Sequence, residues 1–322
     1  MVAPARCWEP VHAAGVAVLH PPVSVAVAHS ARDVPTGGDW AFEPKLDGWR
    51  AVGFTETGLL HSRRGALLAT RFPEISAAVA EIGAGAVVDG ELVALHEGRL
   101  EFTALQGGPQ RREREGITAY LVVFDLLATE DRDLRAWPYE QRRDELERLL
   151  GPPRPHLQLV EMTTDRDTAL EWMDPAFAAA GIEGVMAKPL TSRYAPGARS
   201  GWLKIRHRIT TEAVVLGVAG PDTLVLGHPT TAGWRASGIS LPVPTNLRAE
   251  LTTALRPDEE HPEPRELPGV AAGLPGTEPI TYLPVHPDIV VEIEADTAIE
   301  FGRWRHRPHV LRIRPDLHAT DL

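Results

Sequence analysis

The chain changes character near residue 210, and this change limits the folds that it can adopt. Before that point, short apolar strands alternate with amphipathic helical segments, whereas strand-like runs dominate after it. At 322 residues, the chain is also longer than most single hydrophobic cores. The pattern predicts an α+β domain over residues 21–209, a small β-barrel over residues 210–322, and a flexible N-terminal tail over residues 1–20.

Local patterns predict the elements of both domains. Trp40–Leu46 and Trp49–Thr55 flank Asp47-Gly48, a pair typical of hairpin turns. Val87–Leu95 is interrupted by Asp89-Gly90 and predicts a second pair of strands. The other expected strands are Leu59–Arg63, Tyr120–Leu127, Ala213–Val218, Thr223–Leu226, Ile289–Glu294 and Val310–Ile313. The expected helices are Arg71–Ile82, Tyr139–Leu150, Asp167–Ala180 and Leu247–Leu255, and the Pro- and Gly-rich residues 256–279 predict a long surface loop.

The charge pattern predicts a polyanionic ligand. With 44 acidic and 33 basic side chains, the chain carries −11 at pH 7, which argues against a protein that coats nucleic acid without selectivity. Residues 184–211 nevertheless hold six basic residues and no acidic one, and residues 303–314 hold five arginines and no acidic one. The only lysines in the chain are Lys45, Lys188 and Lys204.

The N-terminal region and the cysteine content indicate the compartment. The single cysteine, Cys7, excludes an intramolecular disulfide framework and is typical of a reducing environment. The apolar residues 11–28 contain Pro21-Pro22 and two histidines, so they suit neither a membrane span nor a signal peptide. We therefore expect a cytoplasmic protein that does not bind membranes.

Lys45 is a candidate for chemistry that arginine cannot perform. It lies in the run from Glu43 to Arg50, next to the expected turn. Taken alone, it is an exposed lysine beside a hairpin. The alternative is a nucleophilic amine at a strand end, which must lose a proton before it attacks. Since a guanidinium stays protonated, this alternative gives a reason for a lysine among so many arginines.

Six short motifs in a fixed order favour the nucleophile. They are Lys45-x-Asp-Gly-x-Arg50, His61-Ser-Arg-Arg-Gly65, Asp89-Gly-Glu-Leu-Val93, Val123-Phe-Asp-Leu-Leu127, Glu183-Gly-Val-Met-Ala-Lys188 and Trp202-Leu-Lys-Ile-Arg206. This set resembles the covalent nucleotidyltransferases, and specifically the ATP-dependent DNA ligases, over residues 21–317. It is most similar to short bacterial ligases of the ligase C type and to the ligase module of bacterial end-joining enzymes.

The resemblance implies a fold and a reaction. The fold is a nucleotidyltransferase (adenylation) domain with ATP-grasp-like antiparallel sheets and helices, followed by an OB-fold barrel. The reaction seals nicks in duplex DNA. ATP adenylates Lys45, AMP moves to the 5′-phosphate at the nick, and the 3′-hydroxyl then attacks to form a 3′–5′ phosphodiester bond. We expect ATP and Mg²⁺ or Mn²⁺ as cofactors, and a monomer that works with DNA repair or end-joining proteins.

The same resemblance implies roles for individual residues. Lys45 is the catalytic nucleophile, and Glu183 and Glu91 are carboxylates that suit a metal ion, with Glu91 also near the ribose. Glu43 shares a strand face with Lys45 and reads the adenine, on which Phe124 stacks. The other residues expected to bind the nucleotide are Arg50, Arg63, Arg199, Lys204, Arg206 and Arg314.

Several alternatives stay open. Arg314 and Asp316 match the family's last motif, Arg-x-Asp-Lys, but Leu317 replaces its lysine, so the C-terminal arginines either orient pyrophosphate or only contact DNA phosphates. Phe124 alone is equally compatible with a core position, and Lys188 has no assigned role. The rival functions are an RNA ligase or capping-type nucleotidyltransferase, and a non-catalytic OB-fold protein that binds nucleic acid.

Overall fold

The computed structural model describes residues 18–231, 233–268, 278–296, 299–300, 303–304 and 306–322. The chain divides into two compact units between Ile205 and Arg206, a few residues before the boundary expected near residue 210. Residues 1–17 of the expected tail lie outside the described residues. Leu19 is buried in the first unit together with Val23 and Val25, so the flexible segment expected up to residue 20 is too long.

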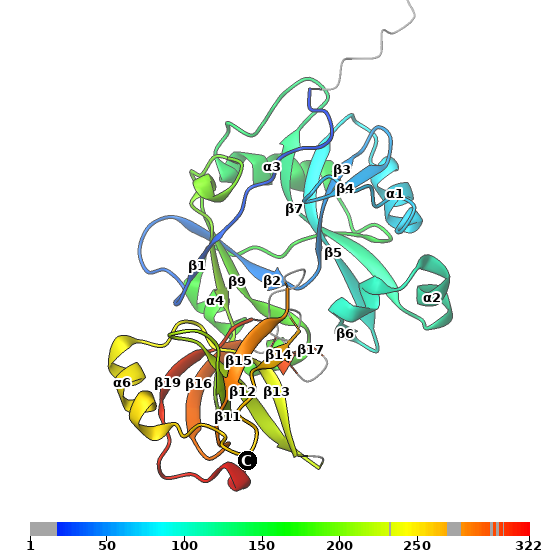
Figure 1. The fold of residues 1–322 in the computed structure, drawn as a ribbon. Helices are drawn as coiled ribbons and strands as arrows, with labels where there is room; N and C mark the ends of the chain where they lie inside the picture. Colours follow the sequence, from blue (N-terminus) through cyan, green and yellow to red (C-terminus); the bar gives the residue numbers. More distant parts are fainter. Residues whose placement is uncertain (1–17, 232, 269–277, 297–298, 301–302, 305) are drawn as a thin grey trace, which may run out of the picture. The chain divides into compact units, whose positions relative to one another are not determined.

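A six-stranded sheet forms the centre of the first unit (Figure 1). Its strands are, in spatial order, β4 (Leu59–Ser62), β3 (Trp49–Phe54), β5 (Val87–His96), β7 (Thr118–Ala128) and β8 (Leu157–Leu159), with β6 (Arg99–Leu100) paired to β5. Helices α1 (Pro73–Ala80) and α3 (Tyr139–Leu150) cover one face, where Ile75 and Leu146 join Val88 and Leu121 in one core. The short helices η1 (Phe102–Gln106) and α2 (Pro109–Arg114) lie between β6 and β7.

A four-stranded sheet completes the first unit. Its strands are, in spatial order, β1 (His29–Ala31), β10 (Leu203–Arg206), β9 (Ile182–Pro189) and β2 (Trp40–Leu46). On one face, Ala169 of α4 (Arg166–Glu171) packs with Phe42, and α5 (Pro175–Ala179) follows. On the other face, Met186 and Trp202 pack with Phe54 of the six-stranded sheet, so the two sheets share a core.

Asp47-Gly48 is not a hairpin turn, and this expectation was wrong. β2 pairs with β9, whereas β3 pairs with β4 and β5, so the chain crosses from one sheet to the other at this point. A side chain at position 48 would collide with the carbonyl oxygen of Leu92. The residues of a turn motif act locally and do not determine with which strands the two flanking strands pair. Here Asp47-Gly48 lies where the chain crosses from one sheet to the other.

Three other expectations for the first unit were wrong in detail. Val87–Leu95 lies within one continuous strand, in which Asp89-Gly90 marks a shift of register against β7 rather than a turn. Asp167–Ala180 forms α4 and α5 rather than one helix, because Pro175 cannot continue a helix and the Asp174 side chain caps the second one. The sheets are mixed rather than antiparallel, since β1 pairs with β10, and β7 with β8, in parallel.

Antiparallel strands and helix α6 (Thr245–Ala254) build the second unit. The strands are β11 (Arg208–Val218), β12 (Leu224–Thr230), β13 (Gly233–Ile239), β14 (Arg265–Leu267), β15 (Ile280–Pro284), β16 (Val290–Asp296), β17 (Ile299–Glu300), β18 (Arg303–Trp304) and β19 (His309–Ile313). The long β11 pairs with β16 along its first part and with β12 and β15 near its end. A long first strand shared between several partners, with a helix after the third strand, agrees with the expected OB-fold barrel.

The sequence patterns missed part of the second unit. β13 and β15 were not expected, and β14 lies inside the predicted loop of residues 256–279, of which residues 269–277 lie outside the described part. β14 has only three residues, and all three strands mix polar with apolar residues, so they lack a clear alternation. Across the described ranges, no helix has the length and apolarity needed to cross a membrane.

Candidate active site

Lys45 stands at the end of β2, where the four-stranded sheet meets the crossing to β3. Its Nζ donates a hydrogen bond to the Glu183 carboxylate and a longer one, 3.4 Å, to the carbonyl oxygen of Leu46. Glu183 comes from β9, where Gly184 is the register partner of Lys45. Both side chains are mostly buried, with exposed fractions of 15% and 11%. The amine is therefore held in one direction and is still open to a ligand.

Arg50 is held by a buried carboxylate to which the sequence motifs assigned no role. Its Nε and Nη2 donate to the two oxygens of Asp89 at 2.5 Å each, and the Tyr194 hydroxyl donates to the same carboxylate. Burial alone lowers the pKa of Arg50, but the fully buried Asp89 outweighs this and raises the pKa above its ordinary value. The guanidinium Cζ lies 4.6 Å from the centroid of the Phe124 ring.

Glu91 is the register partner of Arg50 on β5 and belongs to the same face of the sheet. Loss of solvation raises the pKa of its carboxyl to about 7, while Arg50 and Lys45 counteract this shift and Asp89 and Asp47 add to it. A carboxyl with this pKa changes charge near neutral pH, which is typical of functional sites.

The raised pKa predicts that Glu91 lowers the stability of the folded protein by an amount that depends on pH. Below its ordinary value of 4.5, the carboxyl is neutral in both the folded and the unfolded chain. Between pH 4.5 and about 7 the unfolded chain ionises first, so folding becomes less favourable as the pH rises, and the loss is complete above about 7. Glu91→Gln is therefore expected to melt higher than wild type at pH 8 and equally at pH 4. Thermal unfolding in EDTA tests this, and parallel pH profiles of the two proteins would contradict the shift.

Lys188, which had no assigned role, is one of the most buried groups of the site. Its Nζ donates to Glu43 Oε1 at 2.7 Å and to the carbonyl oxygen of Phe124 at 3.1 Å. Tyr139 also donates to Glu43 Oε1, at 2.5 Å. Burial lowers the pKa of Lys188, and the Glu43 carboxylate opposes this. The Nζ lies 4.5–4.7 Å from the ring centroids of Phe124, Tyr139 and Trp202.

The structure brings together some, but not all, of the expected site residues of the first unit. Lys45, Glu43, Arg50, Glu91, Phe124 and Glu183 lie together on facing strands. Arg63 and Arg199 are exposed and lie in peripheral segments, one in the turn after β4 and the other in the short helix η2 (Ala198–Ser200). Lys204 is half-buried on β10, the neighbour of the strand that carries Glu183.

Two expected site residues, Arg206 and Arg314, belong to the second unit. Arg314 donates to Asp316 and to Glu212 at 2.7 Å each, and the Asp316 pair raises the pKa of Arg314 above its ordinary value. Arg312 binds Glu292. Part of the acid-free C-terminal strip is thus paired with carboxylates from other strands. Leu317 packs with the apolar residues Val214, Val290 and Ala319, which gives a physical reason for an apolar residue there.

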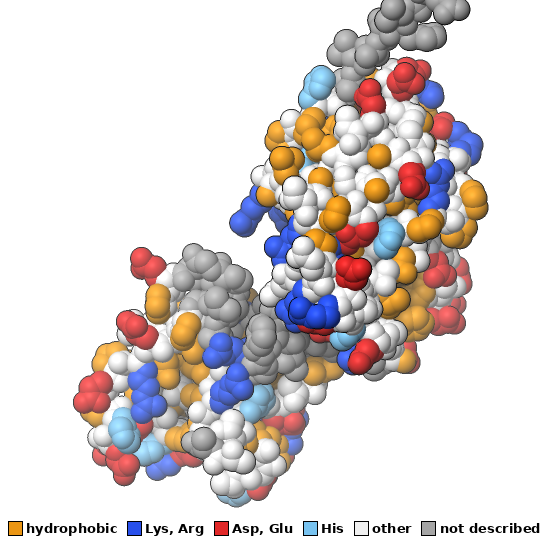
Figure 2. Space-filling view, turned by 90° about the vertical axis from the view of Figure 1, so that its right-hand side faces the viewer, with side chains coloured by type: hydrophobic (Ala, Val, Ile, Leu, Met, Phe, Trp, Pro, Cys, Tyr) orange, Lys and Arg blue, Asp and Glu red, His pale blue; other side chains and the backbone are white. Residues whose placement is uncertain are grey.

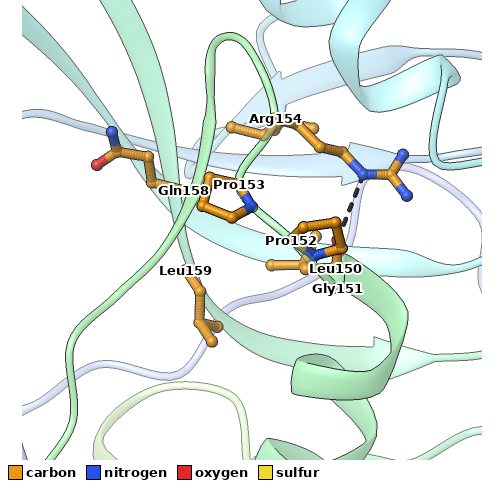
Figure 3. Close-up of a pocket in the computed structure, with 8 residues that line it drawn as sticks. Leu150, Gly151, Pro152, Pro153, Arg154, Gln158 and Leu159 are labelled. Atoms are coloured by element: carbon orange, nitrogen blue, oxygen red, sulfur yellow. Dashed lines mark hydrogen bonds between the residues drawn. The ribbon is translucent and has the colours of Figure 1, made fainter.

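The cavities of the first unit differ in their relation to this cluster. An apolar cavity of about 370 Å³ is lined by Leu46, Val122 and Ile182, among others, and so adjoins Lys45 and Glu183 along the chain. A smaller one of about 240 Å³ lies at the end of α3, where Arg154 Nε donates to the carbonyl oxygen of Leu150 (Figure 3). On the molecular face in Figure 2, acidic and basic side chains are interspersed. Of these two cavities in the described part of the chain, the 370 Å³ one is lined by chain neighbours of the nucleophile candidate.

Known proteins are similar to this chain over most of its length. The family model described as the ATP-dependent DNA ligase domain matches residues 23–206. DNA ligase C2 of Mycolicibacterium smegmatis is 33% identical over 94% of this chain and 93% of the relative, and DNA ligase C of Mycobacterium tuberculosis is 32% identical over 92% and 91%. The crystal structure of the ligase domain of LigD from M. tuberculosis is 27% identical with a TM-score of 0.51, and covers 92% of this chain and 97% of that one.

The match of the family model covers more than half of the chain, and the relatives align along nearly their whole length. These findings agree with the resemblance of the six motifs and with the mixed α+β architecture of the first unit. The chain belongs to the ATP-dependent DNA ligases.

Proposed function

We propose that this protein seals nicks in duplex DNA by way of an AMP group carried on Lys45. The observation that carries the proposal is the placement of the Lys45 amine at a strand end, bonded to Glu183. The fixed guanidinium of Arg50 and the half-buried ring of Phe124 belong to the same cluster. Attack on a nucleotide requires these three parts: a nucleophile, a cation and an aromatic surface.

The first step is attack of Lys45 on ATP. Nζ loses a proton and uses its lone pair to bond to the α-phosphorus, while the bond from that phosphorus to the α–β bridging oxygen breaks and pyrophosphate leaves. Glu183 directs Nζ, because it accepts a hydrogen bond from it. Arg50 contacts the sugar and phosphates, and Glu91 contacts the ribose. The cationic Lys204 and Arg206 stabilise charge that develops on the phosphoryl oxygens.

The pair of Glu43 and Lys188 selects the base. Both hydrogen bonds to the Glu43 carboxylate reach Oε1, and among the described residues none reaches Oε2. Oε2 can therefore accept from the amine of adenine, while Lys188 donates to the adjacent ring nitrogen. Guanine presents the opposite order, an acceptor and then a donor, along that edge. The pair thus favours ATP over GTP, and Phe124 stacks on the purine.

The carboxylates fit a divalent metal ion that ATP helps to hold. In the described part of the chain, no group of three or more His, Cys, Asp or Glu side chains is arranged as a metal site. Mg²⁺ commonly takes only one or two protein carboxylates and completes its shell with phosphates and water. Glu183 and Glu91 supply such hard oxygens next to the nucleophile. Bound Mg²⁺ or Mn²⁺ would neutralise phosphate charge during transfer.

The later steps act on DNA. AMP passes from Lys45 to the 5′-phosphate at the nick, and the 3′-hydroxyl then attacks that phosphate and releases AMP. Arg63 and Arg199, which are exposed at the edge of the first unit, contact phosphates, and Arg314 orients pyrophosphate in the first step. We also propose that the protein acts as a cytoplasmic monomer, together with DNA repair or end-joining proteins.

A sealing assay tests the proposal. The protein is incubated with ATP, Mg²⁺ or Mn²⁺ and a nicked duplex with a labelled 5′-phosphate. We expect a mass gain of one AMP on the protein and a sealed strand on a denaturing gel. Parallel reactions with GTP and with nicked RNA separate the RNA-ligase and capping-type alternatives. A wild-type protein that neither gains AMP nor seals DNA would contradict the proposal and favour a non-catalytic binding protein.

A further inference from the structure

Two tyrosines outside the six motifs each hold a carboxylate of the candidate site. Tyr139, at the start of α3, donates to Glu43 Oε1 at 2.5 Å, and Tyr194, before η2, donates to Asp89. The two tyrosines are almost fully buried, with exposed fractions of 0% and 3%. Burial is the main reason why both hydroxyls have a pKa well above the ordinary value, so they are donors at any physiological pH.

Each of these carboxylates holds a different cation. Glu43 pairs with Lys188, and Asp89 pairs with Arg50. Both cations end at the same ring, because Lys188 Nζ and Arg50 Cζ each lie 4.6 Å from the centroid of Phe124. Two separate hydrogen-bond networks, Tyr139–Glu43–Lys188 and Tyr194–Asp89–Arg50, therefore meet at the Phe124 ring. This is the ring on which, in the proposed function, the purine stacks.

One buried arginine lies against the tyrosines of both hydrogen-bond networks. Arg142 on α3 has its Cζ 5.7 Å from the Tyr139 ring centroid and 5.8 Å from that of Tyr194. It is fixed by a two-point hydrogen bond to Asp125, at 2.8 and 2.9 Å, and by two backbone carbonyls. Asp125 follows Phe124 directly on β7, so the same arginine also anchors the strand that carries the stacking ring.

We propose that Tyr139 and Tyr194 are positioning residues with separate tasks, an inference that rests on the proposed adenylation of Lys45. Tyr139 occupies Oε1 of Glu43 and so fixes the orientation in which Oε2 faces the base, which sets the choice between ATP and GTP. Tyr194 fixes Asp89 and thereby Arg50, which sets the grip on sugar and phosphate for either nucleotide. Without the hydroxyl, each buried carboxylate keeps, among the described residues, only its cation, Lys188 on Glu43 or Arg50 on Asp89, so fewer hydrogen bonds fix its orientation.

Removal of one hydroxyl at a time separates the two tasks. Tyr139→Phe and Tyr194→Phe keep the rings, and Tyr282→Phe in the barrel is the control, since no hydrogen bond of the Tyr282 hydroxyl occurs among the described residues. The rate of label transfer to the protein is measured against the concentrations of ATP and GTP. We expect Tyr139→Phe to reduce the preference for ATP about tenfold, in line with one lost hydrogen bond to a charged group. We expect Tyr194→Phe to raise the half-saturating concentration of both nucleotides about tenfold and to keep their ratio.

The ratio of the two nucleotides is independent of how much of a variant is folded, since one preparation serves both reactions. An unchanged ratio in Tyr139→Phe, or a changed ratio in Tyr194→Phe, overturns the assignment of separate tasks. A Tyr282→Phe variant that behaves like either one overturns it as well. A wild type that takes no label from any nucleotide instead contradicts the proposed function, and this inference with it.

Discussion

Lys45→Arg is expected to take no AMP from ATP, with labelling below about one-thousandth of the wild-type level. The substitution keeps a positive charge at the end of β2, beside the Glu183 carboxylate. A guanidinium, however, does not lose its proton at physiological pH and offers no lone pair to the α-phosphorus. The expected loss is therefore one of chemistry rather than of fold or charge. Intact-protein mass spectrometry after incubation with ATP and a divalent metal ion measures it.

Two comparisons make this result specific. Lys45→Ala should also stay unlabelled, and Lys45→Arg should melt close to wild type, since it keeps a cation beside the Glu183 carboxylate. When pre-adenylated nicked DNA is supplied, the first two steps are bypassed, so Lys45→Arg should regain part of its sealing activity. Labelling of Lys45→Arg at the wild-type level would show that another group carries the AMP.

Arg142→Met is expected to cause the largest loss of stability in the first unit, about 3–5 kcal/mol. Arg142 and Asp125 are both fully buried, and the pair is joined by two hydrogen bonds. The substitution leaves the Asp125 carboxylate buried without its cation, and the carbonyl oxygens of Trp137 and Ser192 lose their donor. Urea unfolding of the purified chain, followed by tryptophan fluorescence, measures the change.

The same helix offers a matched control. Arg148 on α3 pairs with Glu145, but its side chain is 64% exposed, so Arg148→Met should leave the unfolding midpoint unchanged. The double variant Arg142→Met with Asp125→Leu should regain part of the lost stability, because no charge is then buried alone. Recovery should be incomplete, since the two carbonyl oxygens still lack a donor. Equal effects of Arg142→Met and Arg148→Met would contradict this account.

Elements set by local patterns were predicted well. β2 has the expected bounds, Trp40–Leu46, and α3 has the expected bounds, Tyr139–Leu150. In both segments, the spacing of apolar residues reflects the face that is buried, and that spacing is visible within a few residues. The hairpin expected at Asp47-Gly48 was wrong because a turn motif does not say which sheet the next strand will join.

In the candidate site, too, some features follow from local sequence patterns and others depend on the tertiary fold. The motifs pointed to Lys45, Arg50, Glu91 and Glu183, which the structure brings together, because the proposed chemistry requires particular residue types at short spacing. They left out Tyr139, Tyr194 and Arg142, which lie outside the motifs and act through a partner up to 105 residues away. Asp89 was within reach, since it stands in the Asp-Gly-Glu motif, but its link to Arg50 joins residues 39 positions apart.

Lys188 and the C-terminal arginines show most clearly what sequence patterns cannot predict, namely which charges pair in the folded protein. Along the chain, Lys188 is a basic residue in an acid-free strip, and in the structure it is buried against Glu43, 145 positions away. Arg314 also stands in an acid-free strip, yet it binds Glu212 on β11, 102 positions away. The order of strands and helices and the reactive residue types follow from short-range patterns along the chain. The pairing of charges does not, because a buried charge is stabilised by whichever opposite charge the fold brings within a few ångströms of it.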